Sequence, residues 1–276
     1  MRSASHFAKI YTYSSGMRDI LASTAPDFKE GRYEPFDEWG RTAARPERAS
    51  AQRCCSDPNG EDQQRSQRRA RAKVRRLALA NEFRWFVTLT IDPSRVDSHD
   101  GAAVVKKLNA WCSNAVQRHG LRYILVPERH KNGGIHFHGF FSDSLEAVNS
   151  GTIKPPSGGK PRKPRSKAQR DEWLRNGGQI VYNLPGWGWG FTTAIELYGE
   201  YPAAVAYVCK YIGKEGEKPA GRWYYSGGDL REPEVTYAEI SPADLRRDYG
   251  AKCFTLDLPG RQIAVVNGIK GEVCED

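Results

Sequence analysis

The feature that most constrains the fold is a hairpin pattern near the middle of the chain. Two strand-like runs, from Leu121 to Glu128 and from Gly134 to Phe141, flank the sequence Lys131-Asn132-Gly133-Gly134. An Asn-Gly pair between two apolar runs is typical of a tight antiparallel turn. We therefore expect an antiparallel sheet that contains this hairpin.

The runs on either side of the hairpin predict further strands and several helices. Each was assigned from apolar periodicity and from residues that start or stop helices. We expect helices over residues 62–80, 104–120, 167–175, 202–212 and 242–247, and strands over 83–91, 179–183, 189–197 and 263–266, with short strands near Trp223 and Lys252. The predicted fold class is α+β, with an antiparallel sheet of about five strands and helices packed on one face.

Composition divides the chain into three parts. Residues 1–60 lack sustained periodicity and are rich in Ser, Pro, Arg and Glu, which predicts a poorly ordered or accessory segment. Residues 61–226 form the predicted main domain. It contains a basic loop at 151–170 that is too poor in apolar groups to order itself. Residues 227–276 are interpreted as a C-terminal extension.

Basic residues gather in two segments that contain no acidic residue. The whole chain has 42 Lys and Arg against 33 Asp and Glu, a formal net charge of +9. Concentrated positive charge is typical of a protein that binds a polyanion, here nucleic acid, although a solvated helix face and a floppy loop remain the alternative. The candidate nucleic-acid contacts are Arg68, Arg69, Arg75 and Arg76 in the first segment, and Lys160, Arg162, Lys163 and Arg165 in the second.

Composition also argues against several classes of protein. No run approaches the ~20 apolar residues of a membrane span, and the N-terminus lacks the apolar stretch of a secretory signal. The six cysteines form no C-x-x-C pair and include the adjacent Cys54 and Cys55, so neither a disulfide framework nor a structural zinc site is expected. We expect a reduced, soluble protein of the cytoplasm.

Two histidines share one face of the second hairpin strand. Successive side chains of a strand point to opposite faces, so His136 and His138 lie together while Phe137 faces the core. Two imidazoles at this spacing can converge on one cation. A half-exposed strand with two chance histidines is the alternative, because a lone His-x-His motif is common.

A third metal ligand depends on the length of the hairpin loop. A two-residue turn would place Glu128 on the wrong face, whereas a three-residue loop over residues 132–134 pairs Glu128 with His138 and His130 with His136. Glu128 is therefore the predicted third ligand, and His130 is its alternative. Two imidazoles and a carboxylate leave open positions suited to Mg²⁺ or Mn²⁺, and Zn²⁺ would also fit.

A helix near residue 207 carries two tyrosines. Tyr207 and Tyr211 are four residues apart and so lie on one helix face. Each is followed three residues later by a lysine, Lys210 or Lys214. A phenol with a pKa of about 10 is a poor nucleophile unless a cation stabilises its anion. The pattern therefore favours nucleophilic tyrosines, with a pair of rim tyrosines packed against the core as the alternative.

Taken in order, these motifs resemble the rolling-circle replication initiators of the HUH endonuclease superfamily. The Thr-containing strand at 86–90, the His136-Phe137-His138 motif and the tyrosine helix carry the resemblance. The segment 206–214 resembles the two-tyrosine class of initiators typified by the gene A proteins of small isometric bacteriophages and by related microvirus initiators. The similarity covers about residues 83–214.

The resemblance implies an enzyme that nicks and joins one strand of origin DNA through a 5′-phosphotyrosine intermediate. It implies Mg²⁺ or Mn²⁺ held by His136, His138 and Glu128, with Tyr207 and Tyr211 as nucleophiles. Lys210 and Lys214 would stabilise the phenolates or the phosphate. A single-strand transposase or relaxase of the same fold, and a non-catalytic nucleic-acid-binding protein, remain open alternatives.

The sequence also bears on partners. Single-stranded DNA at a replication origin is the expected substrate, and no membrane partner is expected. The sequence contains no G-x-x-x-x-G-K-[ST] motif, so any unwinding must come from a partner. We expect a host helicase and polymerase in the bacterial cytoplasm to supply it.

Overall fold

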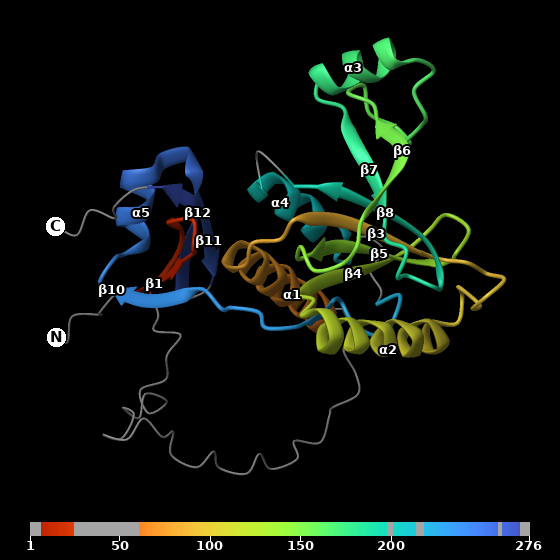
Figure 1. The fold of residues 1–276 in the computed structure, drawn as a ribbon. Coiled ribbons are helices and arrows are strands. Elements are labelled where there is room, and N and C mark those ends of the chain that lie inside the picture. Colours follow the sequence, from red (N-terminus) through yellow and green to blue (C-terminus); the bar gives the residue numbers. More distant parts are fainter. Residues whose placement is uncertain (1–6, 25–60, 198–200, 214–217, 259–260, 271–276) are drawn as a thin grey trace, which may run out of the picture. The chain divides into compact units, whose positions relative to one another are not determined.

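The computed structural model describes residues 7–24, 61–197, 201–213, 218–258 and 261–270 of the 276-residue chain. The chain divides into two compact units (Figure 1). Unit 1 combines residues 1–62 with 233–276, and unit 2 consists of residues 63–232, where the sequence predicted a domain over 61–226.

Unit 1 contains a five-stranded antiparallel sheet with the order β10-β1-β2-β12-β11. Ile10, Ile20 and Val266 from this sheet are buried against Leu245 of helix α5. A capping box between Ser241 and Asp244 starts that helix. The elements are β1 (Phe7–Thr12), β2 (Met17–Ser23), β10 (Glu234–Ala238), α5 (Pro242–Tyr249), the 3₁₀ turn η1 (Gly250–Lys252), β11 (Cys253–Leu258) and β12 (Arg261–Lys270).

The prediction of a poorly ordered N-terminal segment is wrong for residues 7–24. These residues form β1 and β2, and their outer neighbours are β10 and β12, from the other end of the chain. Pairing across more than two hundred residues leaves no local periodicity that a sequence reading can use. Residues 25–60, the rest of the predicted segment, lie outside the described residues.

Unit 2 contains a seven-stranded antiparallel sheet with the order β6-β7-β8-β3-β5-β4-β9. Its strands are β3 (Trp85–Ile91), β4 (Tyr123–Arg129), β5 (Ile135–Phe141), β6 (Val148–Lys154), β7 (Gln179–Asn183), β8 (Gly190–Glu196) and β9 (Tyr225–Gly227). Its helices are α1 (Glu61–Ala80), α2 (Gly101–His119), α3 (Lys167–Arg175) and α4 (Tyr201–Tyr211). The predicted hairpin is β4 and β5, which form the centre of the site described below.

Helices cover both faces of the unit 2 sheet. On one face, Val87 and Leu89 of β3 pack with Val104 and Leu108 of α2 in the main hydrophobic core. On the opposite face, Phe86 of β3 meets α4. The predicted α+β class is therefore confirmed. The predicted strand number and the placement of helices on one face are wrong, because β3 and β5 carry apolar or aromatic side chains on both faces and each face needs a cover.

The second basic segment is ordered. Strands β6 and β7 extend from the sheet with α3 at their outer end (Figure 1), and we call residues 148–183 the β6–β7 arm. Ile153 and Arg162 exchange two backbone hydrogen bonds of 3.0 Å, Ser166 caps α3, and the Arg162 guanidinium lies 5.1 Å from the Trp173 ring centre. The expectation that loop 151–170 cannot order itself is therefore wrong, since hydrogen bonds and a cation–π contact do what apolar burial does elsewhere.

Gly139 tests how tightly β5 lies against β4. A Cβ atom at this position would come within 1.9 Å of the Ile124 carbonyl oxygen. We expect Gly139→Ala to destabilise unit 2 by more than about 3 kcal/mol, because the clash is with backbone and no side chain can move aside. Urea unfolding followed by tryptophan fluorescence measures this. Gly188→Ala is the control, because nothing lies within 4 Å of its Cβ position. Equal midpoints for both variants would contradict the close approach.

Candidate active site

The two histidines of β5 are oriented by threonines of β3. In the β3–β5 register, Thr88 pairs with His138 and Thr90 pairs with His136. The Nδ1 atom of His138 lies 3.0 Å from the Thr88 hydroxyl, and that of His136 lies 3.2 Å from the Thr90 hydroxyl. Both half-buried imidazoles are thus held through Nδ1, which leaves Nε2 as the nitrogen available to an outside ligand.

Glu128 reaches the same site from β4. The hairpin loop consists of residues 131–133: the His130 amide donates to the Gly134 carbonyl at 2.8 Å, and Gly133 has φ 86°. Glu128 pairs with His136 across the strands, yet its Oε2 lies 3.0 Å from His138 Nε2. The carboxylate therefore adjoins both imidazoles of β5.

The predicted strand register is wrong by one step, although the predicted face is right. The loop has three residues as expected, but it begins at Lys131 and not at Asn132, so Glu128 moves from opposite His138 to opposite His136. A shift of two in the pairing sum leaves every side chain on its original face. His130 is exposed, and its ring stacks on that of His136 with centres 4.9 Å apart.

Helix α4 places both tyrosines over this face. The Tyr211 ring stacks on the His138 imidazole, with centres 4.4 Å apart and planes 14° from parallel. The Tyr211 hydroxyl donates a hydrogen bond of 2.6 Å to the Tyr207 oxygen. Tyr207 is 48% exposed, and its ring meets Phe86 edge to face at 5.8 Å. The two phenol oxygens thus lie together beside the histidines, with Tyr207 as the more accessible one.

Burial shapes the protonation of these groups. It lowers the pKa of His136, an effect that neighbouring His130 adds to and Glu128 opposes, so the neutral imidazole is favoured. Burial also raises the pKa of Tyr211 well above its usual range, and the hydrogen bond to Tyr207 adds to this effect. At neutral pH the Tyr211 phenol is therefore a hydrogen-bond donor.

The donor atoms fit a small divalent cation. Within the described ranges, no group of three or more His, Cys, Asp or Glu side chains is already arranged to hold a metal ion. The pair His138 Nε2 and Glu128 Oε2 is 3.0 Å apart, and adjacent ligands of an octahedral ion with bonds of about 2.1 Å are about 3.0 Å apart. His136 lies on the same strand face as a third donor.

The remaining predicted residues fall in three places. Lys210 is exposed in the last turn of α4, and Lys214 lies outside the described residues, so the pairing of each tyrosine with a lysine stays a prediction. In α1, Arg68 and Arg69 are exposed, while Arg75 and Arg76 are half-buried. The four basic candidates of the second segment are exposed on the β6–β7 arm: Lys160, Arg162, Lys163 and Arg165.

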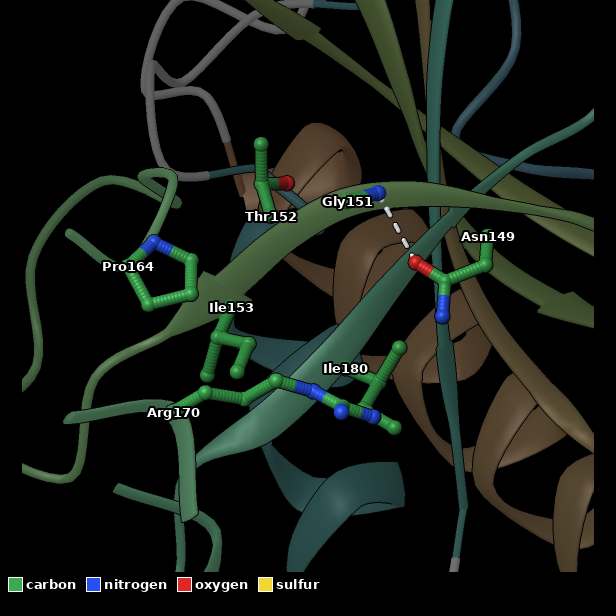
Figure 2. Close-up of a pocket in the computed structure, with 7 residues that line it drawn as sticks. All are labelled: Asn149, Gly151, Thr152, Ile153, Pro164, Arg170 and Ile180. Atoms are coloured by element: carbon green, nitrogen blue, oxygen red, sulfur yellow. Dashed lines mark hydrogen bonds between the residues drawn. The ribbon is translucent and has the colours of Figure 1, made fainter. Parts of the chain in front are cut away.

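Two cavities lie in this part of unit 2. One, of about 370 Å³, lies on the β6–β7 arm (Figure 2), where the Arg170 side chain extends toward Ile180 and the Gly151 amide donates to Asn149 at 2.8 Å. None of its lining residues comes from β5 or α4. The other, of about 210 Å³, is lined in part by Tyr207 and Phe86 and so adjoins the tyrosines.

Helix α1 anchors the C-terminal end of α4. The Gln67 amide donates to the carbonyls of Ile212 at 3.2 Å and Gly213 at 2.7 Å, and Arg71 Nε donates to Ile212 at 3.0 Å. These side chains satisfy carbonyls that a helix end otherwise leaves unpaired. Sequence reasoning missed this role, because Gln67 and Ile212 are 145 residues apart and Arg71 was assigned only to a basic face.

Comparison with known proteins supports a role in replication. Residues 84–216 match the family model of the replication-associated protein ORF2. The matched segment runs from β3 through α4 and includes both histidines and both tyrosines. It supports a rolling-circle replication initiator family and does not resolve the two-tyrosine class within it. No curated protein and no solved structure matches the chain.

The helices of the fold are those of a packed domain. Among the described residues, no helix combines the length and the apolar character that crossing a bilayer requires. The longest helices of unit 2, α1 and α2, are amphipathic elements of the fold described above.

The Gln67 contact can be tested by substitution. We expect Gln67→Ala to lower the stability of unit 2 by about 1 kcal/mol, the usual net value of such hydrogen bonds, and to speed amide exchange in the last turn of α4. Hydrogen exchange followed by mass spectrometry measures the second effect locally. Gln64→Ala, an exposed glutamine of the same helix, is the matched control. Unchanged exchange in α4 would show that α1 does not hold this helix end.

Proposed function

We propose that this protein nicks and rejoins single-stranded origin DNA through a covalent 5′-phosphotyrosine and thereby initiates rolling-circle replication. The observation that carries the proposal is the stacking of Tyr211 on His138 at 4.4 Å, while Glu128 contacts the same imidazole at 3.0 Å. Candidate nucleophile and candidate metal ligands therefore meet in one place. The match of residues 84–216 to a replication-associated family supports the biological role.

Three side chains would hold the metal: His136 and His138 through Nε2, and Glu128 through its carboxylate. Mg²⁺ or Mn²⁺, when bound, would polarise the scissile phosphate and offset the charge that develops on it. Thr88 and Thr90 bind the Nδ1 atoms and so hold each ring in one orientation. Outer contacts of this kind usually tune metal affinity about 10- to 100-fold.

Tyr207 is placed to attack first. Its hydroxyl is exposed, and it accepts a hydrogen bond from Tyr211 that would stabilise negative charge on its oxygen. In the proposed step, a Tyr207 O–P bond forms and the P–O3′ bond of the DNA breaks. The tyrosine loses a proton, and the departing 3′ oxygen gains one. One phosphodiester replaces another, so the reaction needs no nucleotide cofactor and reverses readily.

Tyr211 would serve the second attack. After a round of replication, the enzyme remains joined to the first 5′ end and must cut the regenerated origin. A second phenol 2.6 Å from the first can attack at the same phosphate site after a small movement of α4 or of the DNA. Lys210 and Lys214 remain candidates for stabilising either phenolate.

The exposed basic residues would bind the DNA backbone. Arg68 and Arg69 project from α1, and Lys160, Lys163 and Arg165 project from the β6–β7 arm. Phosphate contacts give salt-sensitive affinity and carry little base specificity. Arg75, Arg76 and Arg162 belong to the same two segments and are assigned the same role.

The metal assignment can be tested by removing either imidazole. We expect His136→Ala and His138→Ala each to lower covalent adduct formation more than about 100-fold, while single-strand binding persists because the basic segments supply it. A labelled single-stranded DNA library with Mn²⁺, resolved on denaturing gels, measures the adduct. His119→Ala, exposed on α2, is the control. Wild-type cutting by the double histidine variant would overturn the metal assignment.

The two tyrosines can be separated in the same assay. Tyr207→Phe and Tyr211→Phe should each leave measurable adduct, because the other phenol remains beside the histidines. The double variant should lose more than about a thousandfold, as expected when every nucleophile is removed. Tyr224→Phe is a matched control in unit 2. If one single variant lost all adduct and the other behaved as wild type, including in strand joining, only one tyrosine would be a nucleophile.

A further inference from the structure

The cavity beside Tyr207 is built from both the active site and the β6–β7 arm. Its volume is about 210 Å³, and its lining includes Tyr207 and Tyr201 of α4, Phe86 of β3, Glu196 of β8, and Lys154 and Gln179 of the arm. Pockets for drug-sized ligands measure about 300–1,000 Å³. This cavity therefore suits a smaller group, such as one nucleobase.

Strand register places the arm residues on the catalytic face of the sheet. Lys154 pairs with Gln179 across β6 and β7, and Val181, two residues after Gln179, pairs with Ile195. Ile195 pairs in turn with Phe86 of β3. Paired residues share a face, as do residues two apart on a strand. Gln179 and Phe86 thus share the face that carries His138, and a strand leaving Tyr207 toward the arm would cross the cavity.

We propose that this cavity binds one unpaired deoxynucleotide next to the scissile phosphate, and that it selects adenine or cytosine over thymine or guanine. The proposal rests on the proposed nicking function and names the base that it requires. Phe86 and Tyr207 offer aromatic rings for the base to stack on. Lys154 offers a positive charge to the adjoining phosphate.

Glu196 and Gln179 supply the selectivity. One Glu196 oxygen accepts a hydrogen bond from Arg84 Nε at 3.1 Å, and a carboxylate has further lone pairs to accept another. The Gln179 amide offers a donor and an acceptor. Adenine and cytosine carry an exocyclic amino group beside a ring nitrogen that accepts, which matches this pair. Thymine and guanine would instead place a carbonyl oxygen against the Glu196 carboxylate.

The test sequences the DNA that the protein cuts. The full-length chain is incubated with a randomised single-stranded DNA library and Mn²⁺, and covalent adducts are isolated and sequenced around the nick. We expect wild-type adducts to be enriched in adenine or cytosine at one position beside the nick. Gln179→Ala should reduce this enrichment at least about fivefold, and Glu196→Gln should admit thymine and guanine. Gln117→Ala, exposed on α2, should retain the wild-type preference.

The outcomes separate this inference from the proposed function. Lys154→Ala should lower total adduct without changing the preferred base, because a phosphate contact does not read sequence. Adducts with the same base preference in wild type, Gln179→Ala and Glu196→Gln would overturn the cavity assignment and leave nicking intact. A wild-type preference for thymine or guanine beside the nick would overturn the base selectivity. Failure of the wild-type chain to form any adduct would overturn the proposed function itself.

Discussion

The site depends first on the antiparallel register of three adjacent strands, β3, β5 and β4. That register sets Thr88 opposite His138 and Glu128 opposite His136, so ring orientation and the carboxylate contact both follow from it. A slip by one residue would turn the histidines into the core and bring Phe137 to the site face. The hairpin loop at 131–133 prevents such a slip, and the backbone of β4 lies so close to Gly139 that no side chain fits there.

The position of α4 is the second condition, and α1 provides much of it. At one end, the Tyr201 hydroxyl donates to the Ala78 carbonyl at 2.7 Å, and at the other end Gln67 and Arg71 bind the carbonyl of Ile212. Tyr211 on His138 then completes the contact between helix and sheet. Because α1 also carries exposed arginines, the element that would hold the DNA backbone is the element that holds the tyrosine helix in place.

The β6–β7 arm extends the same catalytic face beyond the central strands. Its basic residues are exposed along a ribbon that hydrogen bonds and a capped helix keep ordered. At its junction with β8, the ribbon contributes Lys154 and Gln179 to the cavity beside Tyr207. Nonspecific grip on phosphates and recognition of a single base would thus come from one structural element, with the nucleophile at its inner end.

Local periodicity determined much of what the sequence alone predicted correctly. The α+β class, the hairpin, the common face of His136 and His138, and the common face of Tyr207 and Tyr211 all depend on residues two to four positions apart. Tertiary structure decided the rest: the partner of Glu128, the covering of both sheet faces, the strands at residues 7–24 and the cavity beside Tyr207. These features join segments up to two hundred residues apart, and they arise because unpaired strand edges and apolar faces must find partners that no local pattern identifies.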